Sequence, residues 1–249
     1  MLLKNLIKNI PANINNIEIS NLASDSRKVK KGCLFFALQG SKLDGNNFIT
    51  QAVKKGAKAI VCSRKIKTIQ KKIPIIRVEN TRESLGYACS KFFDKKPENI
   101  IAVTGTNGKS SVAEFFYQIL EKNNYSVASI GTLGIKFKNK LKSTNLTSLD
   151  VISLHKELFI LKKLGINNVI IEASSHGLAQ GRMNGIDFKI GIFTNFSQDH
   201  LDYHKNMKNY FNSKMILFSK LLKNKKIIIA DKEIREFSKL KKISKRKKL

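Results

Sequence analysis

A glycine-bearing turn between an apolar run and a helix-type pattern is the segment with the clearest chemical meaning. Residues 100–111 read Ile-Ile-Ala-Val-Thr-Gly-Thr-Asn-Gly-Lys-Ser-Ser. The glycines let the backbone close around an anion, and the N–H groups at the start of a helix favour negative charge. Lys109 is placed to reach the β- and γ-phosphates of a nucleotide, and the Ser110 hydroxyl is placed to ligate Mg²⁺. The predicted nucleotide-binding residues are Gly105, Thr106, Asn107, Gly108, Lys109, Ser110 and Ser111.

This signal is weaker than a complete Walker motif. The full pattern has glycine where Val103 stands, so only its second half is present. The alternative interpretation is an ordinary turn between strand and helix that binds nothing. Because strand, turn, lysine, hydroxyl and helix follow in the required order, the segment favours phosphate binding.

A carboxylate and a histidine follow two other apolar runs. Glu172 comes directly after residues 169–171, and His200 follows residues 190–195. The carboxyl ends of parallel strands meet at one edge of a sheet, so we expect both side chains beside the phosphate turn, where they can share a divalent cation. For either residue alone, a capping carboxylate or a surface histidine is the simpler interpretation. Their joint position favours a metal site.

The elements that must position these residues alternate between strands and helices. Strands are expected at 100–104, 126–130, 168–173 and 189–195, a hairpin at 135–141, and helices at 110–123 and 149–164. This order implies right-handed crossovers and a mostly parallel sheet covered on both faces.

The front of the chain predicts a smaller α/β unit. Strands are expected at 33–38, 59–62 and 75–78, and helices at 48–55 and 81–93. The polar segment 94–99 contains one of only three prolines and precedes a new apolar strand. We therefore predict an N-terminal domain over 1–96 and a central domain over 97–249.

Composition narrows the class of protein. The net charge is +29, but lysine is scattered through the whole chain, which argues against a patch built for nucleic acid. No apolar run approaches the length of a bilayer span, and the three cysteines form no pair or metal-ligand set, which predicts a cytoplasmic protein. Residues 1–10 have the pattern of a short amphipathic helix, and the basic run 239–249 that of a solvated or frayed end.

Three motifs together resemble the Mur ligase family. The phosphate turn Thr104–Ser110 looks like the nucleotide loop of these enzymes and of folylpolyglutamate synthase. The segments EASSHGLAQGR, starting at Glu172, and FTNFSQDHLDYH, ending at His204, resemble the branch that adds diaminopimelate or lysine to UDP-N-acetylmuramoyl-dipeptide. The resemblance implies an ATP-dependent amide ligase that transfers the γ-phosphoryl group to a carboxylate and forms an acyl phosphate. An amine then attacks this intermediate.

The resemblance also implies roles for individual residues. Glu172 and His200 would help Ser110 hold Mg²⁺, and Lys214, in a helix-type segment, would be carbamylated and assist the metal; from the sequence alone it is a surface lysine. The implied catalytic residues are Lys109, Glu172, His200 and Lys214. The implied contacts to the muramoyl peptide are Thr147, Ser148, Ser174, Gln180 and Arg182, and those to UDP are Ser24, Ser26, Ser41 and Lys42.

The family has three domains, and the resemblance covers the first and part of the second. We therefore expect the C-terminal ligase domain to be absent from this sequence, and we expect a monomer. A truncated, inactive module that retains nucleotide or UDP-sugar binding is the alternative to a working ligase. A basic nucleic-acid-binding protein ranks last, because it rests on charge alone.

Overall fold

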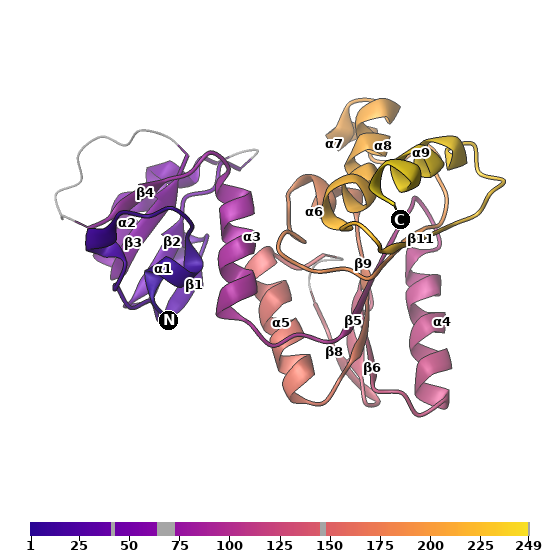
Figure 1. Cartoon of the computed structure of the whole chain (residues 1–249), viewed down its shortest axis with the longest axis horizontal. Coiled ribbons are helices and arrows are strands. Elements are labelled where there is room, and N and C mark those ends of the chain that lie inside the picture. The colour runs from indigo at the N-terminus through magenta and orange to yellow at the C-terminus, as the bar shows by residue number, and fades with distance from the viewer. Residues whose placement is uncertain (41–42, 64–72, 145–147, 249) are drawn as a thin grey trace. The chain divides into compact units, whose positions relative to one another are not determined.

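The computed structural model describes residues 1–40, 43–63, 73–144 and 148–248, and the chain divides into two units, Met1–Asp94 and Lys95–Leu249 (Figure 1). Ser41, Lys42 and Thr147, which are predicted substrate contacts, lie outside the described residues. Of the helices in the described ranges, none is long and apolar enough to cross a membrane.

The first unit contains a parallel four-stranded sheet in the order β1-β2-β3-β4. Its elements are α1 (Leu3–Leu6), β1 (Asn21–Ala23), β2 (Cys33–Phe36), α2 (Ile49–Lys54), β3 (Ala57–Cys62), β4 (Ile75–Arg77) and α3 (Thr81–Phe92). Asn80 caps α3, because its side chain accepts hydrogen bonds from the amides of Arg82 and Glu83. The strands and helices predicted here are confirmed, and the sequence pattern missed the short strand β1.

The start of the chain is less helical than its pattern predicts. Only Leu3–Leu6 form a helix, and the Met1 amino group donates to the Ile19 carbonyl at 2.9 Å. Leu2 also forms an isolated bridge with Glu18. Pairing with the following segment holds the ends of this stretch extended, so the expected helix over residues 1–10 is shortened.

The second unit is built on a seven-stranded sheet in the order β11-β10-β5-β9-β6-β7-β8. Its strands are β5 (Asn99–Thr104), β6 (Val127–Gly131), β7 (Gly134–Phe137), β8 (Lys140–Lys142), β9 (Asn168–Glu172), β10 (Ile190–Phe193) and β11 (Ile227–Ala230). The strands from β11 to β6 are parallel, and β7 and β8 extend the sheet as antiparallel strands. This confirms the predicted mostly parallel sheet and the hairpin at its edge.

Helices cover the two faces of this sheet unequally (Figure 1). Helix α4 (Lys109–Lys122) lies on one face, over β5, β9 and β6. The other face carries α5 (Val151–Lys163), the helices α8 (Met207–Ile216) and α9 (Phe237–Lys247), and the π-helical turn η4 (Leu217–Leu221). Two short helices, α6 (Ser175–Ala179) and α7 (Leu201–His204), follow β9 and β10.

The basic C-terminal run is helical, so the expectation of a frayed end was wrong, whereas most of its basic side chains are exposed, as a solvated end requires. Residues Phe237–Lys247 form α9, in which Leu240 is only 2% exposed within the main core. Lys247 donates to the Leu222 carbonyl at 2.5 Å. The lysines of α9 lie on a helix whose apolar residues face the sheet, so a high local charge did not prevent packing.

Candidate functional site

The phosphate turn joins β5 to α4 and is held by the end of β10. The amide of Thr106 donates to the Asn195 carbonyl at 3.0 Å, and that of Asn107 to the Asn195 side-chain oxygen at 2.9 Å. A Cβ atom at Gly105 would lie 1.9 Å from the Thr194 hydroxyl oxygen, so only glycine fits there. Gly108 has φ +81°, a left-handed conformation that glycine adopts freely.

Helix α4 begins directly after this turn without a side-chain cap. Its N-cap residue is Gly108, which offers no acceptor to the amides of the first turn. Uncapped amides at a helix start bind anions well, because the donors and the helix dipole point the same way. The turn therefore has the features that a phosphate group requires.

Lys109 folds back over the turn. Its ammonium donates to the carbonyl oxygens of Gly105 at 3.1 Å and Thr106 at 2.6 Å. Burial lowers the pKa of Lys109, while the nearby carboxylates of Glu172 and Asp199 act in the opposite direction. The cation thus already lies where the phosphates of a nucleotide would meet the turn.

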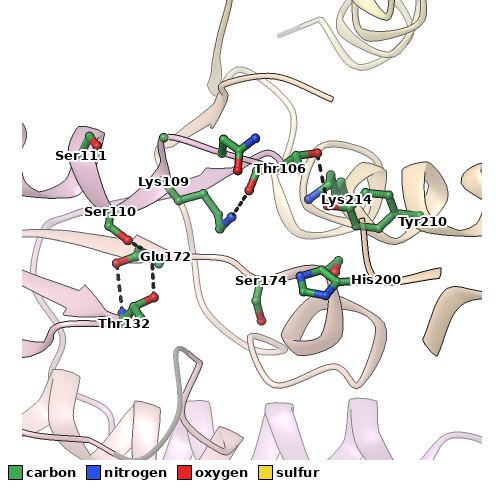
Figure 2. A pocket seen from close by; sticks show the side chains of 13 residues that line it. Thr106, Lys109, Ser110, Ser111, Thr132, Glu172, Ser174, His200, Tyr210 and Lys214 are labelled. Carbon is green, nitrogen blue, oxygen red and sulfur yellow. Dashed lines mark hydrogen bonds between the residues drawn. The ribbon is translucent and has the colours of Figure 1, made fainter. Parts of the chain in front are cut away.

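Glu172 is a buried carboxylate held by three hydrogen bonds (Figure 2). Ser110 Oγ donates to Oε2 at 2.9 Å, Thr132 Oγ1 donates to the same oxygen at 3.2 Å, and the Thr132 amide donates to Oε1 at 3.0 Å. A Cβ atom at Gly131 would lie 2.0 Å from Oε1. The carboxylate is therefore locked in one orientation toward the start of α4.

Lys214, on α8, is 1% exposed and is one of the largest buried side chains. Its ammonium donates to the Gly105 carbonyl at 2.6 Å and lies 4.4 Å from the centre of the Tyr210 ring. The pKa of Lys214 is lowered to about 7, mainly by burial and also by the nearby charge of Lys109, while Asp199 acts in the opposite direction. A lysine with such a pKa is partly neutral, and hence nucleophilic, at physiological pH.

Histidine and tyrosine rings form a cluster close to Lys214. The rings of His176 and His200 lie 5.0 Å apart, and those of His204 and Tyr210 lie 5.2 Å apart. Burial lowers the pKa of both His176 and His204, and each pKa is lowered further by neighbouring histidines. His200 contacts the Asp199 carboxylate at 3.3 Å and has a left-handed backbone, with φ +51°.

These side chains surround one cavity of about 390 Å³, here called the phosphate-loop cavity (Figure 2). It is lined by Thr106, Asn107, Gly108, Lys109, Ser110, Ser111, Thr132, Glu172, Ser174, Ser175, His200, Tyr210 and Lys214. The structure thus brings together the four residues predicted to be catalytic. They come from α4, from the end of β9, from the start of α7 after β10, and from α8.

Of the residues predicted to contact a muramoyl peptide, some line the cavity and others lie beside it. Ser174 lines the cavity and caps α6, while Ser148 bonds to Ser174 between the hydroxyl oxygens at 2.9 Å. Arg182 donates to the Gln180 side-chain oxygen at 2.7 Å and to the Ser148 carbonyl at 2.6 Å. Ser148, Gln180 and Arg182 thus form a network next to the cavity, not part of its lining.

A second hollow of about 520 Å³ lies in the first unit and is here called the N-terminal cleft. It is lined by Ser24, Asp25, Ser26, Arg27, Phe35, Leu38, Gly40, Leu43, Gly45, Phe48, Gln51 and Arg82. Ser24 and Ser26 are the predicted UDP contacts among the described residues. The Ser26 hydroxyl donates to the Gln51 side-chain oxygen at 2.6 Å.

The phosphate-loop cavity suits magnesium bound together with a nucleotide. Among the described residues, no group of three or more His, Cys, Asp or Glu side chains is placed to hold a metal alone. Mg²⁺ is usually bound by one or two carboxylates together with substrate phosphates. The Glu172 carboxylate and the hydroxyls of Ser110 and Thr132 are hard oxygen donors of this kind, so the residues fit that ion.

Sequence reasoning missed Thr132 and Tyr210. Thr132 follows β6, whose carboxyl end lies at the same sheet edge as Glu172, so the rule that located Glu172 also pointed to Thr132. Tyr210 donates to the Thr106 hydroxyl at 3.2 Å from a position 104 residues away, and no local pattern signals that contact.

Comparison with known proteins identifies the family. Residues 103–249, more than half of the chain, match the model of the Mur ligase middle domain, and residues 18–93 match the Mur ligase family, catalytic domain. The chain belongs to the Mur ligase family. The phosphate turn, Glu172, His200 and Lys214 all lie within the matched middle domain.

Several relatives have the same name. Proteins named UDP-N-acetylmuramoyl-L-alanyl-D-glutamate--2,6-diaminopimelate ligase are 43% identical over 225 residues in Bradyrhizobium diazoefficiens, and 43% identical over 231 residues in Buchnera aphidicola. These matches cover 89% and 90% of this chain but 46% of each relative. The chain therefore spans about half the length of the curated relatives it matches.

Solved structures also show a similarity to Mur ligases over about half of each relative. A structure of UDP-N-acetylmuramoyl-L-alanyl-D-glutamate--2,6-diaminopimelate ligase aligns with a TM-score of 0.85 at 28% identity, covering 99% of this chain and 50% of that one. The MurF ligase from Thermotoga maritima in complex with ADP shares the fold, with a TM-score of 0.56 at 21% identity, covering 93% of this chain and 49% of that one.

Proposed function

We propose that this chain serves an ATP-dependent amide ligase that adds a diamino acid to UDP-N-acetylmuramoyl-L-alanyl-D-glutamate in peptidoglycan precursor synthesis. The observation that carries the proposal is the meeting of Lys109, Glu172 and Lys214 around one cavity at the carboxyl edge of a parallel sheet. Family membership and the names of the relatives indicate the substrate class, and these names favour diaminopimelate over lysine as the amine.

The proposed reaction begins with positioning of ATP. The uncapped start of α4 and the Lys109 ammonium are placed to bind the β- and γ-phosphates, replacing the loop carbonyls that Lys109 now contacts. Ser110, Glu172 and His200, which line the same cavity, would hold Mg²⁺. The metal supplies charge neutralisation as the γ-phosphoryl group moves to the substrate carboxylate.

Lys214 has a second proposed role. A carbamate forms when a neutral amine attacks carbon dioxide, and a pKa of about 7 leaves a substantial share of Lys214 neutral at physiological pH. Carbamylation would replace a buried cation, which lies near Lys109, with an anion that assists the magnesium site. The like charge of Lys109 and burial both favour loss of the positive form.

The substrate groups would occupy two places. We propose that the UDP part binds in the N-terminal cleft, where Ser24 and Ser26 offer hydroxyls beside apolar side chains. Ser174 would contact the muramoyl peptide at the phosphate-loop cavity, and Arg182, Gln180 and Ser148 would orient that segment. Cys33, Cys62 and Cys89 are buried and form no disulfide, which agrees with a protein that works in the reducing cytoplasm.

A second candidate function is a binding module that retains nucleotide or UDP-sugar affinity without forming amides. It is favoured by the span of the matches, which cover 46% of the length of two relatives. In amide ligation, water exclusion and alignment of the amine contribute much of the rate. If the residues that exclude water and align the amine lie in the unmatched half of the relatives, this chain alone binds its substrates and forms no amide bond.

Phosphate release decides between the two candidates. The purified chain is mixed with ATP, Mg²⁺ and UDP-N-acetylmuramoyl-L-alanyl-D-glutamate, with and without diaminopimelate, and amide product is followed by mass spectrometry. Release and product that need both substrates support the ligase. Binding of the UDP-sugar without release supports the binding module, and absence of both binding and release contradicts both candidates. The Lys109→Met variant is the negative control.

A further inference from the structure

His155, on α5, is a fully buried histidine with no part in the chemistry proposed above. Its Nε2 atom lies 2.9 Å from the Asn184 carbonyl oxygen. A carbonyl only accepts hydrogen bonds, so Nε2 carries the proton and donates. The pKa of His155 is lowered to about 4, mainly by burial and also by the charge of Lys96, while the bond to Asn184 acts in the opposite direction. The ring is therefore neutral near pH 7 and keeps one fixed donor.

The other ring nitrogen indicates why a histidine stands at this position. Nδ1 of His155 is buried and has no hydrogen-bond partner among the described residues. A buried polar atom without a partner costs free energy, and a leucine at this position would avoid that cost. Packing alone therefore does not account for the imidazole, and its contribution is the hydrogen bond from Nε2 to Asn184.

Asn184 closes the turn that carries Arg182. Its amide donates to the Gly181 carbonyl at 3.1 Å, and a Cβ atom at Gly181 would lie 2.8 Å from the Asn184 Nδ2 atom. Gly181 has φ +67°, a left-handed conformation that glycine adopts freely. The Arg182 amide donates to the Gly177 carbonyl at 2.9 Å, which ties the turn to α6. The position of the Asn184 backbone therefore helps to set how Arg182 leaves the turn.

The start of α5 also holds the Arg182 side chain. Its Nη1 atom donates to the Ser148 carbonyl at 2.6 Å, and its Nε and Nη2 atoms donate to the Gln180 side-chain oxygen at 3.0 and 2.7 Å. Ser148 comes shortly before Asp150, the residue that caps α5, and His155 lies in the first half of the same helix. Helix α5 thus contacts this turn through two hydrogen bonds, one to the arginine side chain and one to the turn backbone.

These contacts leave the guanidinium able to bind an anion. An arginine side chain has five N–H donors, and the bonds to Gln180 and Ser148 use three of them. Within the described parts of the chain, one N–H group on each terminal nitrogen remains for a ligand. Two such donors on one planar group suit a carboxylate. A planar group of this kind binds well only when its position is fixed, so the anchoring of the turn matters for recognition.

We infer that His155 is a positioning residue that fixes, through the Asn184 carbonyl, the turn that presents Arg182 to a carboxylate of the peptide substrate. The identity of that substrate rests on the proposed function. The coupling between His155 and Arg182 rests on the hydrogen bonds of the turn and of α5 alone.

The first test is the affinity of the purified chain for UDP-N-acetylmuramoyl-L-alanyl-D-glutamate, measured by calorimetry. His155→Leu has a similar volume and removes the donor, so we expect about tenfold weaker binding. His155→Gln keeps an N–H donor of similar reach, so we expect an affinity within about twofold of that of the unchanged chain. The affinity for ATP stays the same in both variants, because neither His155 nor Arg182 lines the phosphate-loop cavity.

A double-mutant cycle separates positioning from folding. In the Arg182→Met background, His155→Leu causes no further loss of affinity, because its effect passes through the arginine. Leu161→Ala, at an equally buried position of α5, is the matched control: it lowers the urea midpoint and leaves substrate affinity unchanged. The inference is overturned by equal losses for His155→Leu in both backgrounds, or by a loss in His155→Gln as large as that in His155→Leu.

A second measurement needs no substrate, so a chain that binds no UDP-sugar counts against the proposed function and still tests this inference. The ¹H–¹⁵N signal of Arg182 Nε is assigned by its loss in Arg182→Met and followed by NMR. We expect its hydrogen exchange to be at least about fivefold faster in His155→Leu than in the unchanged chain or in His155→Gln, since the bond to Gln180 opens more often. The Nε signal of Arg27, which bonds to Asp25 in the first unit, is the internal control. Equal exchange at Arg182 in all three proteins overturns the inference.

Discussion

The phosphate-loop cavity and the N-terminal cleft differ in the exposure of their charged side chains. In the phosphate-loop cavity, Glu172 and Lys214 are 2% and 1% exposed, and each is held by short hydrogen bonds. In the N-terminal cleft, the Asp25–Arg27 ion pair lies at the surface, with side chains 29% and 84% exposed. Buried charges interact strongly and shift pKa values, whereas exposed pairs contribute little. The first hollow is therefore suited to chemistry and the second to binding by shape.

The largest effect is expected from Lys109→Met, which tests whether the first hollow binds phosphate through charge. Hydrogen bonds from a charged group contribute about 1.5–3 kcal/mol each, so ATP affinity falls by about 100-fold. Calorimetry with Mg²⁺ and ATP measures it. Lys140→Met, on the exposed strand β8, is the control and keeps its affinity. A change below about threefold for Lys109→Met would contradict a phosphate site.

The pH dependence of the free energy of unfolding tests whether the charge of Lys214 in the phosphate-loop cavity is as perturbed as its burial implies. Its pKa in the folded chain is about 7, below the ordinary value of 10.5. Between these values the unfolded chain holds a proton that the folded chain has lost, so the free energy of unfolding rises with pH. The rise reaches up to about 1.4 kcal/mol per pH unit. The stability cost of burying this lysine is thus largest below pH 7 and is relieved as the pH increases.

Urea unfolding at several pH values, in buffers free of carbon dioxide, measures this slope. The Lys214→Met variant keeps the apolar stem and removes the titrating group, so its stability changes less with pH over the same window. Identical slopes for the two proteins would show that Lys214 titrates normally in the folded chain.

Thr132→Ala tests the orientation of the buried carboxylate. The variant loses the hydroxyl bond to Glu172 Oε2 and keeps the amide bond to Oε1. A hydrogen bond contributes about 1 kcal/mol, so binding of Mn²⁺ with nucleotide weakens by about fivefold. Electron paramagnetic resonance of Mn²⁺ measures it, and Thr132→Ser restores most of the affinity. Unchanged Mn²⁺ affinity in Thr132→Ala would show that the orientation of the Glu172 carboxylate does not contribute to metal binding.

The smallest effect is expected in the N-terminal cleft, from Ser26→Ala. The change removes the hydrogen bond to Gln51 in a cleft lined largely by apolar groups. Affinity for UDP-N-acetylmuramoyl-dipeptide falls by about two- to fivefold, which fits the loss of one neutral hydrogen bond. Fluorescence competition measures it, and ATP affinity stays the same. A matching loss of ATP affinity would show that the two hollows do not act independently.

Most of the fold is predictable because local sequence patterns indicate its strands and helices. The phosphate turn, the apolar run before Glu172 and the run before His200 each carry their strand signal within about ten residues. The carboxyl-edge rule then predicted their meeting, which the cavity lining confirms. The assigned roles of these residues remain predictions.

Long-range packing determines the parts of the structure that local sequence patterns do not predict. Lys214 has the sequence context of a surface lysine, yet it lies buried against the Gly105 carbonyl, 109 residues away. The helix α9 is rich in lysine, and it is held by Leu240 in the main core and by the hydrogen bond from Lys247 to the Leu222 carbonyl. In both cases a distant partner decides the structure, so no window of neighbouring residues contains the information.

The start of α4 differs from the starts of three other helices. Side chains of Asn80, Asp150 and Asn206 accept hydrogen bonds from the first-turn amides of α3, α5 and α8, whereas Gly108 leaves those of α4 uncapped. Amides without such a cap open more readily. In the ligand-free chain, deuterium enters the first turn of α4 sooner than the first turns of α3, α5 and α8. A bound phosphate slows this exchange, so ligand binding orders the helix start that lacks a cap of its own.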